Sequence, residues 1–228
     1  MAAKLFPLPA NKGDRARRKL LMAALEKFAA KGYDSASIRE IADAAGQNVA
    51  SIAYYFGSKK KLYIALLEGI GGHLREVFAA SAGEMLARLD GGTLESAEAV
   101  SGLQQMMRTM IGLQFRGGDF DKVRQIMIHE QTAPSDCYPI LYEGMLRPLH
   151  ERFTRLLAIA RGEDPEQPEV ILRAHALFGQ AISFTWARPT IVRRLGVRQL
   201  DDSHLGSITA LIDEHIDLIC NSHSVSPR

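Results

Sequence analysis

The side chains best suited to chemistry lie close together between residues 47 and 61. A short helix is predicted there, with polar and small side chains on its outer surface and three lysines soon after it. Hydrogen-bonding groups, flat aromatic rings and small residues suit a helix that enters the major groove of DNA, where base edges and phosphates are contacted. The outward residues are Gln47, Asn48, Ala50, Ser51, Tyr54 and Tyr55, and the lysines are Lys59, Lys60 and Lys61.

Two short helices joined by a glycine turn are predicted to position these side chains. Ser37 and Glu40 have the spacing of a capping box, in which each side chain satisfies the other residue's backbone N–H, so a helix is expected to begin at residue 38. Gly46 ends that helix, and we expect glycine there because the two helices meet closely. Asn48 is the expected N-cap of the second helix, over residues 49–56.

Longer helices are predicted on either side of this pair. Apolar residues recur at three- and four-residue spacing from residue 14 to residue 31, and Gly32 closes that helix. Ser58 can cap a long helix whose first turn carries the three lysines, although lysines there oppose the helix dipole. In isolation such a run is ordinary solvated surface, but its place directly after the exposed helix favours phosphate contact.

The charge is distributed unevenly along the chain. Residues 1–61 carry 12 Lys and Arg against 5 Asp and Glu, a net of +7, whereas the remaining residues carry 16 against 21, a net of −5. A basic head on an acidic body suits a protein of which only one end approaches a polyanion. This distribution supports the DNA-binding interpretation independently of the helix pattern.

Residues 14–70 resemble the amino-terminal domain of TetR-type transcriptional regulators. The resemblance is carried by the blocks ALEKFAAKGYDSAS, IREIADAAG and YYFGSKKKL, and it departs from the family pattern at Ala53, a position that is often aromatic. It implies base-edge readout and phosphate contacts by two sets of residues. The implied base readers are Gln47, Asn48, Ser51 and Tyr54, the implied phosphate contacts are Ser37, Tyr55 and Lys59, and Arg39 could do either.

Composition excludes several other classes of protein. A chain of 228 residues with 46% hydrophobic and 24% charged residues is typical of a globular protein with one large domain or two smaller ones. No apolar run approaches the roughly 18 residues of a membrane span, and the start lacks the apolar stretch of a secretory signal. Cys137 and Cys220 are too few for a disulfide framework, so we expect the reducing cytoplasm.

The rest of the chain shows helical patterns and no convincing strand, so the expected fold class is all-α. Helices are predicted to continue to residue 88 and then over residues 94–115, 119–132, 135–160, 168–187 and 203–221. The expected domains are a flexible basic arm over residues 1–13, a helix-turn-helix domain over residues 14–70, and a helical regulatory and dimerisation domain over residues 71–228.

Two sites are expected in this helical body. Methionine and aromatic side chains suit a pocket for varied apolar ligands, although most such residues in a helical bundle are simply core. The expected pocket residues are Met106, Met110, Met127, Tyr138, Tyr142, Met145 and Phe178. Apolar stripes on the last two predicted helices suggest a dimer interface, or else cover the monomer core. The expected interface residues are Ile171, Phe178, Ile182, Leu205, Ile208, Ile212, Ile216 and Ile219.

No catalytic or metal site is expected. His129-Glu130 begins like a zinc-protease motif, but Ala133 stands where the second histidine is required. The acidic residues near His215 are better explained as an exposed helix face than as metal ligands. No cofactor is predicted, because phosphate-binding glycine loops and nucleophile–base pairs are missing from the sequence.

The body also resembles a narrower group, the CecR-like regulators, in HEQTAP at 129–134, RPLHERFTRLLA at 147–158 and HALFGQAISF at 175–184. Together these features predict a homodimeric repressor that binds operator DNA and is released by a small apolar or amphipathic molecule. The alternatives are a small-molecule enzyme on a helical scaffold and a non-specific architectural DNA-binding protein, which would require positive charge over more than one end.

Overall fold

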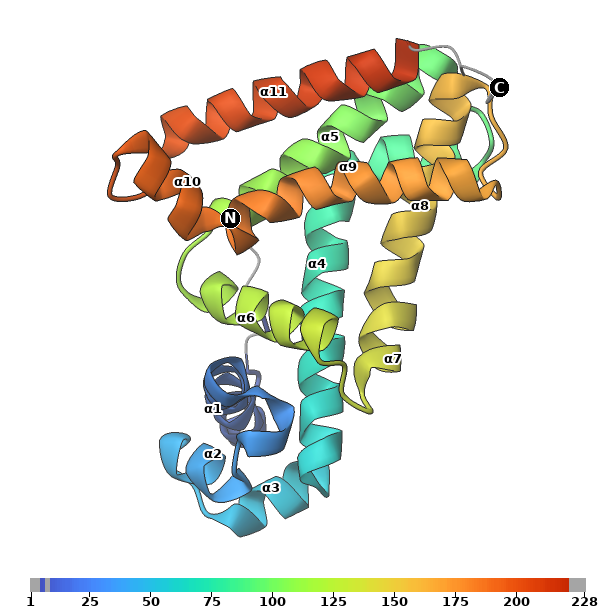
Figure 1. The fold of residues 1–228 in the computed structure, drawn as a ribbon. Helices are drawn as coiled ribbons and strands as arrows, with labels where there is room; N and C mark the ends of the chain where they lie inside the picture. The colour runs from blue at the N-terminus through green and yellow to red at the C-terminus, as the bar shows by residue number, and fades with distance from the viewer. Residues whose placement is uncertain (1–4, 7–8, 222–228) are drawn as a thin grey trace. The chain divides into compact units, whose positions relative to one another are not determined.

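The computed structural model describes residues 5–6 and 9–221, and these residues form helices joined by short connections, with no β-strand among them (Figure 1). The expected all-α fold class is confirmed, while residues 1–4 and 7–8 of the expected arm, residues 1–13, lie outside the described residues. The helices are α1 (Lys12–Ser35), α2 (Ile38–Ala44), α3 (Val49–Phe56), α4 (Lys59–Asp90), α5 (Ser96–Phe115), α6 (Asp119–Thr132), α7 (Tyr138–Leu141), the π-helical turn η1 (Tyr142–Leu146), α8 (Arg147–Arg161), α9 (Pro168–Trp186), α10 (Arg188–Leu195) and α11 (Asp202–Asn221).

The first helices begin at short polar side chains that bond to the backbone three residues later. Asn11 Oδ1 accepts a hydrogen bond from the N–H of Asp14 at 2.8 Å and starts α1. Ser58 Oγ accepts one from the N–H of Lys61 at 3.1 Å and starts α4, as expected from the sequence. Gly32 interrupts α1 with φ +74°, after which one further turn extends the helix to Ser35.

Two segments differ from the predicted helices. The helix predicted over residues 135–160 consists of α7, η1 and α8, because a wider turn over residues 142–146 interrupts the regular hydrogen bonding. The helix α10 was not predicted. Its signals were present in the sequence, since Pro189 stands in the first turn and Gly196 follows the last residue with φ +68°.

Contacts divide the chain into two compact units. Unit 1 comprises residues 1–76 and 117–147, and unit 2 comprises residues 77–116 and 148–228. The helices α1, α2, α3, α6 and α7 therefore belong together with the first part of α4, so this division differs from the expected boundary between residues 70 and 71. The segment with α6 and α7 joins the head because α6 packs against α1.

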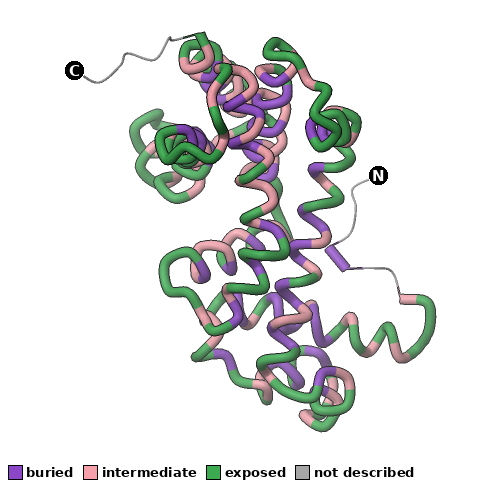
Figure 2. Tube along the Cα trace, turned by 90° about the vertical axis from the view of Figure 1, so that its right-hand side faces the viewer, coloured by how far each residue is buried: buried purple, intermediate pink, exposed green. Residues whose placement is uncertain are grey.

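Each unit has its own buried core, seen as the purple segments of the trace in Figure 2. In unit 1 the core is made of apolar side chains from α1 to α4. Its largest fully buried members are Leu20, Leu25, Phe28, Ile41, Ile52, Leu62, Tyr63, Leu66, Leu67 and Ile70. In unit 2, α5 packs against α9 and α11. Fully buried side chains there include Leu89, Leu103, Met107, Phe153, Leu156, Leu157, Leu177 and Ile216.

The part of α4 in unit 2 contains a break. Ala82 has φ −141° and ψ 19°, which is outside the helical region. Gln105 of α5 compensates by donating from Nε2 to the carbonyl of Ser81 at 3.3 Å, and Thr109 donates to Ser81 Oγ at 3.0 Å. Within the described residues, no helix combines the length and hydropathy that crossing a membrane would require.

Candidate DNA-binding surface

The start of α2 is held in place by local hydrogen bonds. Ser37 Oγ accepts from the N–H of Arg39 at 3.2 Å, and Glu40 Oε2 accepts from the N–H of Ser37 at 3.3 Å, so the expected capping box is present. Lys31 Nζ donates to Glu40 at 2.6 Å. This hydrogen bond and that of Ser37 hold the pKa of the Glu40 carboxyl below its ordinary value, so Glu40 stays charged and α1 is tied to the start of α2.

Gly46 is required by its backbone conformation and not by a close approach of helices. Its φ is +62°, a region that residues with a side chain rarely adopt. No atom lies within 4 Å of the position that a Cβ would take. The expected steric reason for glycine is therefore wrong, and the turn itself provides the reason. Gln47 continues that turn, since its N–H donates to the carbonyl of Ala42 at 2.9 Å.

The exposed side of α3 carries the predicted recognition residues. Asn48 Oδ1 caps the helix by accepting from Ser51 N at 2.9 Å and from Ser51 Oγ at 3.0 Å, which leaves the Asn48 amide nitrogen for an external acceptor. The Tyr54 side chain is 82% exposed, the highest value among the exposed large hydrophobic residues. Its ring meets that of Tyr55 edge-on, with centroids 4.9 Å apart. Ala53 is exposed beside them and leaves the helix surface low at that point.

Tyr55 and Gln47 lie closer to α1 than the sequence suggested. The Tyr55 hydroxyl lies 3.9 Å from the Cβ position of Gly13, near the start of α1. Gln47 is half-buried, and its Nε2 donates to the carbonyl of Ala16 at 2.7 Å. This contact argues against the base-reading role expected for Gln47, because its donor is already used to hold the turn against α1.

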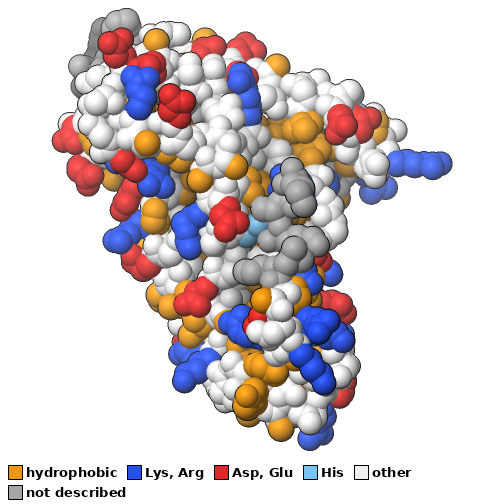
Figure 3. Space-filling model, turned by 180° about the vertical axis from the view of Figure 1, so that it is seen from behind, with side chains coloured by type: hydrophobic (Ala, Val, Ile, Leu, Met, Phe, Trp, Pro, Cys, Tyr) orange, Lys and Arg blue, Asp and Glu red, His pale blue; other side chains and the backbone are white. Residues whose placement is uncertain are grey.

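Basic side chains surround this helix pair in unit 1, and Figure 3 shows Lys and Arg side chains over that part of the surface. Lys59 Nζ lies 4.8 Å from the centre of the Tyr33 ring and donates to the carbonyl of Asp34 at 3.0 Å. An ammonium group has three donors, so two remain for a phosphate. The Arg17 guanidinium lies over the Phe56 ring at 5.0 Å. Arg39 is exposed on α2.

A buried hydrogen bond links α6 to the same unit. The Tyr63 hydroxyl on α4 donates to Glu130 Oε1 on α6 at 2.7 Å, and Glu130 is 1% exposed. Burial, followed by this hydrogen bond, raises the pKa of the Tyr63 hydroxyl, so Tyr63 remains a donor. The Ser135 N–H donates to the other Glu130 oxygen at 3.2 Å, and His129 Nε2 lies 3.1 Å from the carbonyl of Ala29 on α1. No pattern in the sequence indicates this pairing.

The expected pocket residues are divided between the two units. Met127, Tyr138, Tyr142 and Met145 belong to unit 1, whereas Met106, Met110 and Phe178 belong to unit 2. Met106 and Met110 are buried core residues, and the Phe178 ring packs edge-on against Phe153 with centroids 4.7 Å apart. A surface hollow in unit 2 lies instead at the α4 break. It is lined by residues 79–85, Arg88, Leu94, Glu98, Ser101, Gly102 and Gln105.

The structure corrects the expected dimer interface on α11. Ile208, Ile212 and Ile216 are buried within the chain, on the side of α11 that packs against α5, and Leu205 and Ile219 are partly covered. Phe178 is half-buried, and its ring packs against His150 and Phe153 of α8. The large apolar residues that are exposed on these helices are Ile171, Leu172, Ile182 and Trp186 of α9 and Leu211 and Leu218 of α11. Ile171 and Ile182 were expected; the other four were not.

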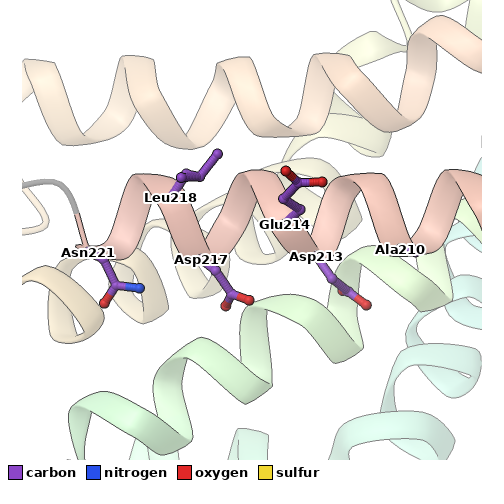
Figure 4. A pocket seen from close by; sticks show the side chains of 6 residues that line it. All are labelled: Ala210, Asp213, Glu214, Asp217, Leu218 and Asn221. Atoms are coloured by element: carbon purple, nitrogen blue, oxygen red, sulfur yellow. The ribbon is translucent and has the colours of Figure 1, made fainter.

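Among the described residues, no group of three His, Cys, Asp or Glu side chains is arranged to hold a metal ion. Glu130, the second residue of the abandoned His-Glu motif, instead accepts the Tyr63 hydrogen bond. Asp213 and Asp217 on α11 bond to Arg108 and Gln104 of α5, at 2.7 and 3.0 Å. Figure 4 shows both side chains directed toward α5, while Glu214 and Leu218 lie on the other side of α11.

Comparison with known proteins finds relatives for both the N-terminal and the C-terminal part of the chain. Residues 20–66 match the family of bacterial regulatory proteins of tetR type, and residues 99–222 match the C-terminal domain of the HTH-type transcriptional dual regulator CecR. The chain is 36% identical over 214 residues to the dual regulator CecR of Shigella flexneri, covering 93% of this chain and 95% of that protein. It is 43% identical to the repressor NicS of Pseudomonas putida over 61 residues, 27% of this chain and 29% of NicS.

Solved structures share the fold at low sequence identity. The hemolysin II regulator HlyIIR matches with a TM-score of 0.58 and 18% identity, over 88% of this chain and 98% of that one. AibR, solved with isovaleryl coenzyme A and operator DNA, matches with a TM-score of 0.59 and 16% identity, over 88% and 97%. The matched families are families of transcriptional regulators, which sets the enzyme alternative aside. The chain therefore belongs to the TetR family of bacterial regulatory proteins and is a DNA-binding transcriptional regulator with a CecR-type C-terminal domain.

Proposed function

We propose that this regulator represses transcription as a homodimer that binds operator DNA through α3 and is released when a small apolar or amphipathic molecule binds the chain. The observation that supports operator binding most directly is the exposed side of α3. It presents the Asn48 amide and the Tyr54 ring from a helix whose start and preceding turn are held by hydrogen bonds to the rest of unit 1. A recognition helix that is ordered before binding loses little freedom on the DNA.

The residues of this surface divide into two roles. We assign base-edge contacts to Asn48, Ser51 and Tyr54, and phosphate contacts to Ser37, Arg39, Tyr55 and Lys59. Gln47 becomes a positioning residue, because its amide donates to the carbonyl of Ala16. A base contact contributes roughly 1–3 kcal/mol of discrimination, whereas a phosphate contact strengthens binding to all sequences alike.

Selection of bound fragments from the source genome, followed by fluorescence anisotropy with the selected duplex, tests operator binding. We expect at least 10³-fold tighter binding to the selected duplex than to a scrambled one of equal length, as is typical of specific regulators. Asn48→Ala should reduce this ratio, and Lys59→Ala should weaken both duplexes equally. Equal affinity of the wild-type chain for both duplexes would instead support the non-specific architectural alternative.

We place the dimer interface on the exposed apolar sides of α9 and α11. The side chains of Leu172, Trp186 and Leu218 are 68%, 64% and 61% exposed, and large apolar residues of this kind are stabilised by burial against a partner. A two-fold pair would present two α3 helices to successive major grooves, about 34–36 Å apart or somewhat more. The AibR structure contains operator DNA, and we extend that mode of binding to this chain by analogy.

We propose that the ligand acts on unit 2, at the hollow beside the α4 break. Met85 lies there, with its Sδ 2.9 Å from the Cβ position of Gly102, and methionine adapts easily to a new neighbour. Met106 and Met110, which were expected to line the pocket, are buried in the core and do not line this hollow. A ligand that displaces Gln105 from the Ser81 carbonyl would change the geometry of α4, the helix that also carries Lys59.

The helix α6 is bonded to two other helices of unit 1. Because Glu130 and His129 bond to α4 and α1, a shift of α6 would move the helices that hold α2 and α3. Release requires only that the ligand bind the DNA-incompetent state more tightly, by about 1–3 kcal/mol for typical coupling. Repression of genes also implies a cytoplasmic location, where the chromosome lies.

Thermal shift against a panel of apolar and amphipathic compounds, including short acyl-coenzyme A esters, tests the ligand. We expect a stabilising compound to lower operator affinity by 5- to 150-fold, which corresponds to the coupling above. Gln105→Ala removes the hydrogen bond to Ser81 that the ligand is proposed to break, so it should lower the operator affinity of the ligand-free protein and reduce the further loss that the compound causes. A compound that stabilises the protein and leaves operator binding intact would refute the release mechanism.

A further inference from the structure

The helix α10 has a charge pattern that the DNA-binding function does not use. Residues 188–198 contain four arginines and no Asp or Glu, although the chain beyond residue 61 has a net charge of −5. Arg188 anchors the helix, since its Nη2 donates to the carbonyl of Gln114 at 2.6 Å and its guanidinium lies 5.6 Å from the centre of the Phe115 ring. Arg193 and Arg194 are exposed in the last turn, and neither forms an ion pair with another described residue.

The C-terminal half of α11 has the opposite charge. Residues 210–221 contain three acidic residues and no Lys or Arg, and they line a shallow surface hollow. Glu214 is exposed and lies with Leu218 on the side of α11 that is turned away from α5 (Figure 4). Leu211, Glu214 and Leu218 are spaced by three and four residues, so Glu214 belongs to the exposed apolar stripe of α11. The Arg161 guanidinium donates to the carbonyl of Ile219, and Arg108 pairs with Asp213, so the negative charge of this half of α11 rests on Glu214 and Asp217.

The basic and acidic groups lie at opposite ends of the exposed apolar face. The helix α10 follows α9 directly, and α11 runs back alongside α9, so that α10 is at one end and Asn221 at the other (Figure 1). Figure 3 shows basic side chains standing out at the α10 end. Within one chain, Glu214 lies 12 residues beyond Asp202, which begins α11 at the α10 end, a rise of about 18 Å along the helix.

A two-fold axis brings these ends together between chains. When the two-fold axis is perpendicular to α9 and α11, rotation by 180° reverses the direction of the helices, so a feature at one end of the face in one copy meets the other end in its partner. Gly179, near the middle of α9, is exposed with no atom within 4 Å of its Cβ position, which leaves room for a partner helix to cross there.

We propose that α10 contacts the second copy of the chain in the dimer. Arg193 and Arg194 of each protomer bind the acidic C-terminal half of α11, around Glu214, in its partner. The contact occurs twice in the dimer and sets the register in which the two apolar faces meet. This inference depends on the dimer proposed above. Ion pairs at the rim of an interface contribute modestly to affinity, and their main effect is to select one register and one partner.

Charge reversal tests the contact, because its effect on pairing is specific. One variant, Arg193→Glu/Arg194→Glu, makes both ends of the face acidic; a second, Glu214→Arg, makes both ends basic. Each homodimer then opposes like charges, and we expect the dimer dissociation constant from sedimentation equilibrium to rise roughly tenfold. Glu68→Arg, the same charge change on α4 in unit 1, is the control and should leave the constant unchanged.

Mixing the two variants gives the decisive result. In a mixed dimer, both contacts pair opposite charges, so mixed dimers should exceed the statistical half of the population by native mass spectrometry. The triple variant should again form homodimers of near wild-type affinity but pair poorly with the wild-type chain. These preferences should weaken in about 0.5 M salt, where exposed charges are screened.

The outcomes separate this inference from the dimer itself. A wild-type dimer with random pairing in the mixture overturns the role of α10 and leaves the dimer standing. A wild-type chain that stays monomeric at micromolar concentration overturns both. Circular dichroism spectra of the variants should match that of the wild type, since Arg193, Arg194 and Glu214 are all exposed. The variant Arg193→Gln/Arg194→Gln removes the positive charges without adding repulsion, so it should raise the dimer dissociation constant by only about threefold.

Discussion

The hydrogen bond from Tyr63 to Glu130 gives a quantitative prediction for the stability of the DNA-binding unit. Tyr63→Phe removes only the hydroxyl, and the ring contacts remain, with centroids 4.7 Å from Phe28 and 4.8 Å from Tyr33. Glu130 is 1% exposed and keeps a single hydrogen bond from Ser135, at 3.2 Å. Because hydrogen bonds to charged groups contribute about 1.5–3 kcal/mol, we expect the free energy of unfolding to fall by about 2–3 kcal/mol.

A double-mutant cycle isolates this interaction from other effects. Glu130→Gln keeps an oxygen for Tyr63 but places an NH₂ group toward the Ser135 N–H, so it is destabilising by itself. The cycle of Tyr63→Phe, Glu130→Gln and the double variant, measured by urea unfolding with circular dichroism, should give a coupling energy above about 1 kcal/mol. A coupling below about 0.3 kcal/mol would show that the buried pair does not hold α6 to α4.

The pH dependence has a defined sign. The pKa of Tyr63 in the folded protein is raised above its ordinary value of 10.0, so the folded state retains a proton that the unfolded state loses. The resulting stability is fully present below pH 10 and is lost as the pH rises above it, by about 1.4 kcal/mol per pH unit. The wild-type chain should therefore lose stability faster than Tyr63→Phe between pH 10 and 11. Parallel curves would refute the shift.

Three further predictions concern the turn, the phosphate contacts and the dimer. Gly46→Ala should lower the free energy of unfolding by about 1 kcal/mol, because alanine disfavours φ +62°. Gly46→Asn should lower it by less, since asparagine tolerates that region and the space around it is open. Equal losses in urea unfolding would contradict the backbone explanation. Lys59→Ala should reduce the slope of log affinity against log salt by about 1 without changing the preferred operator, and an unchanged slope would remove Lys59 from the phosphate contacts. Leu172→Glu should yield folded monomers, as measured by sedimentation. Ile212 is 1% exposed within the chain, so Ile212→Glu should instead unfold unit 2. Folded monomers from Ile212→Glu would restore the interface expected from the sequence.

Features that depend on neighbouring residues could be predicted from the sequence. The caps at Ser37, Asn48 and Ser58 each join groups two or three residues apart, so residue type and spacing specify them without knowledge of the fold. The same holds for the glycine that ends α2. The resemblance of residues 14–70 to a known family rested on these local patterns, and the family match over residues 20–66 confirms it.

The choice between two apolar faces was decided only by tertiary structure. On α11, Ile208, Ile212 and Ile216 lie on one side and Leu211 and Leu218 on another, and both sets have helical spacing. Periodicity shows that a stripe is apolar, but it does not show which partner covers it. The packing of α5 against α11 buries the isoleucines, and the leucines are left exposed.

Long-range polar contacts were likewise outside the reach of the sequence. Gln47 bonds to a residue 31 positions away, Lys59 to one 25 away, and Tyr63 to one 67 away. Such contacts depend on how complete helices pack, so the residue types allow them without requiring them. A helix-turn-helix head and an all-helical body could be predicted from the sequence alone, because these follow from local caps and periodicity. The tertiary structure decided which recognition side chains point outward, and that α6 belongs with the head, because only packing brings distant groups within hydrogen-bonding distance.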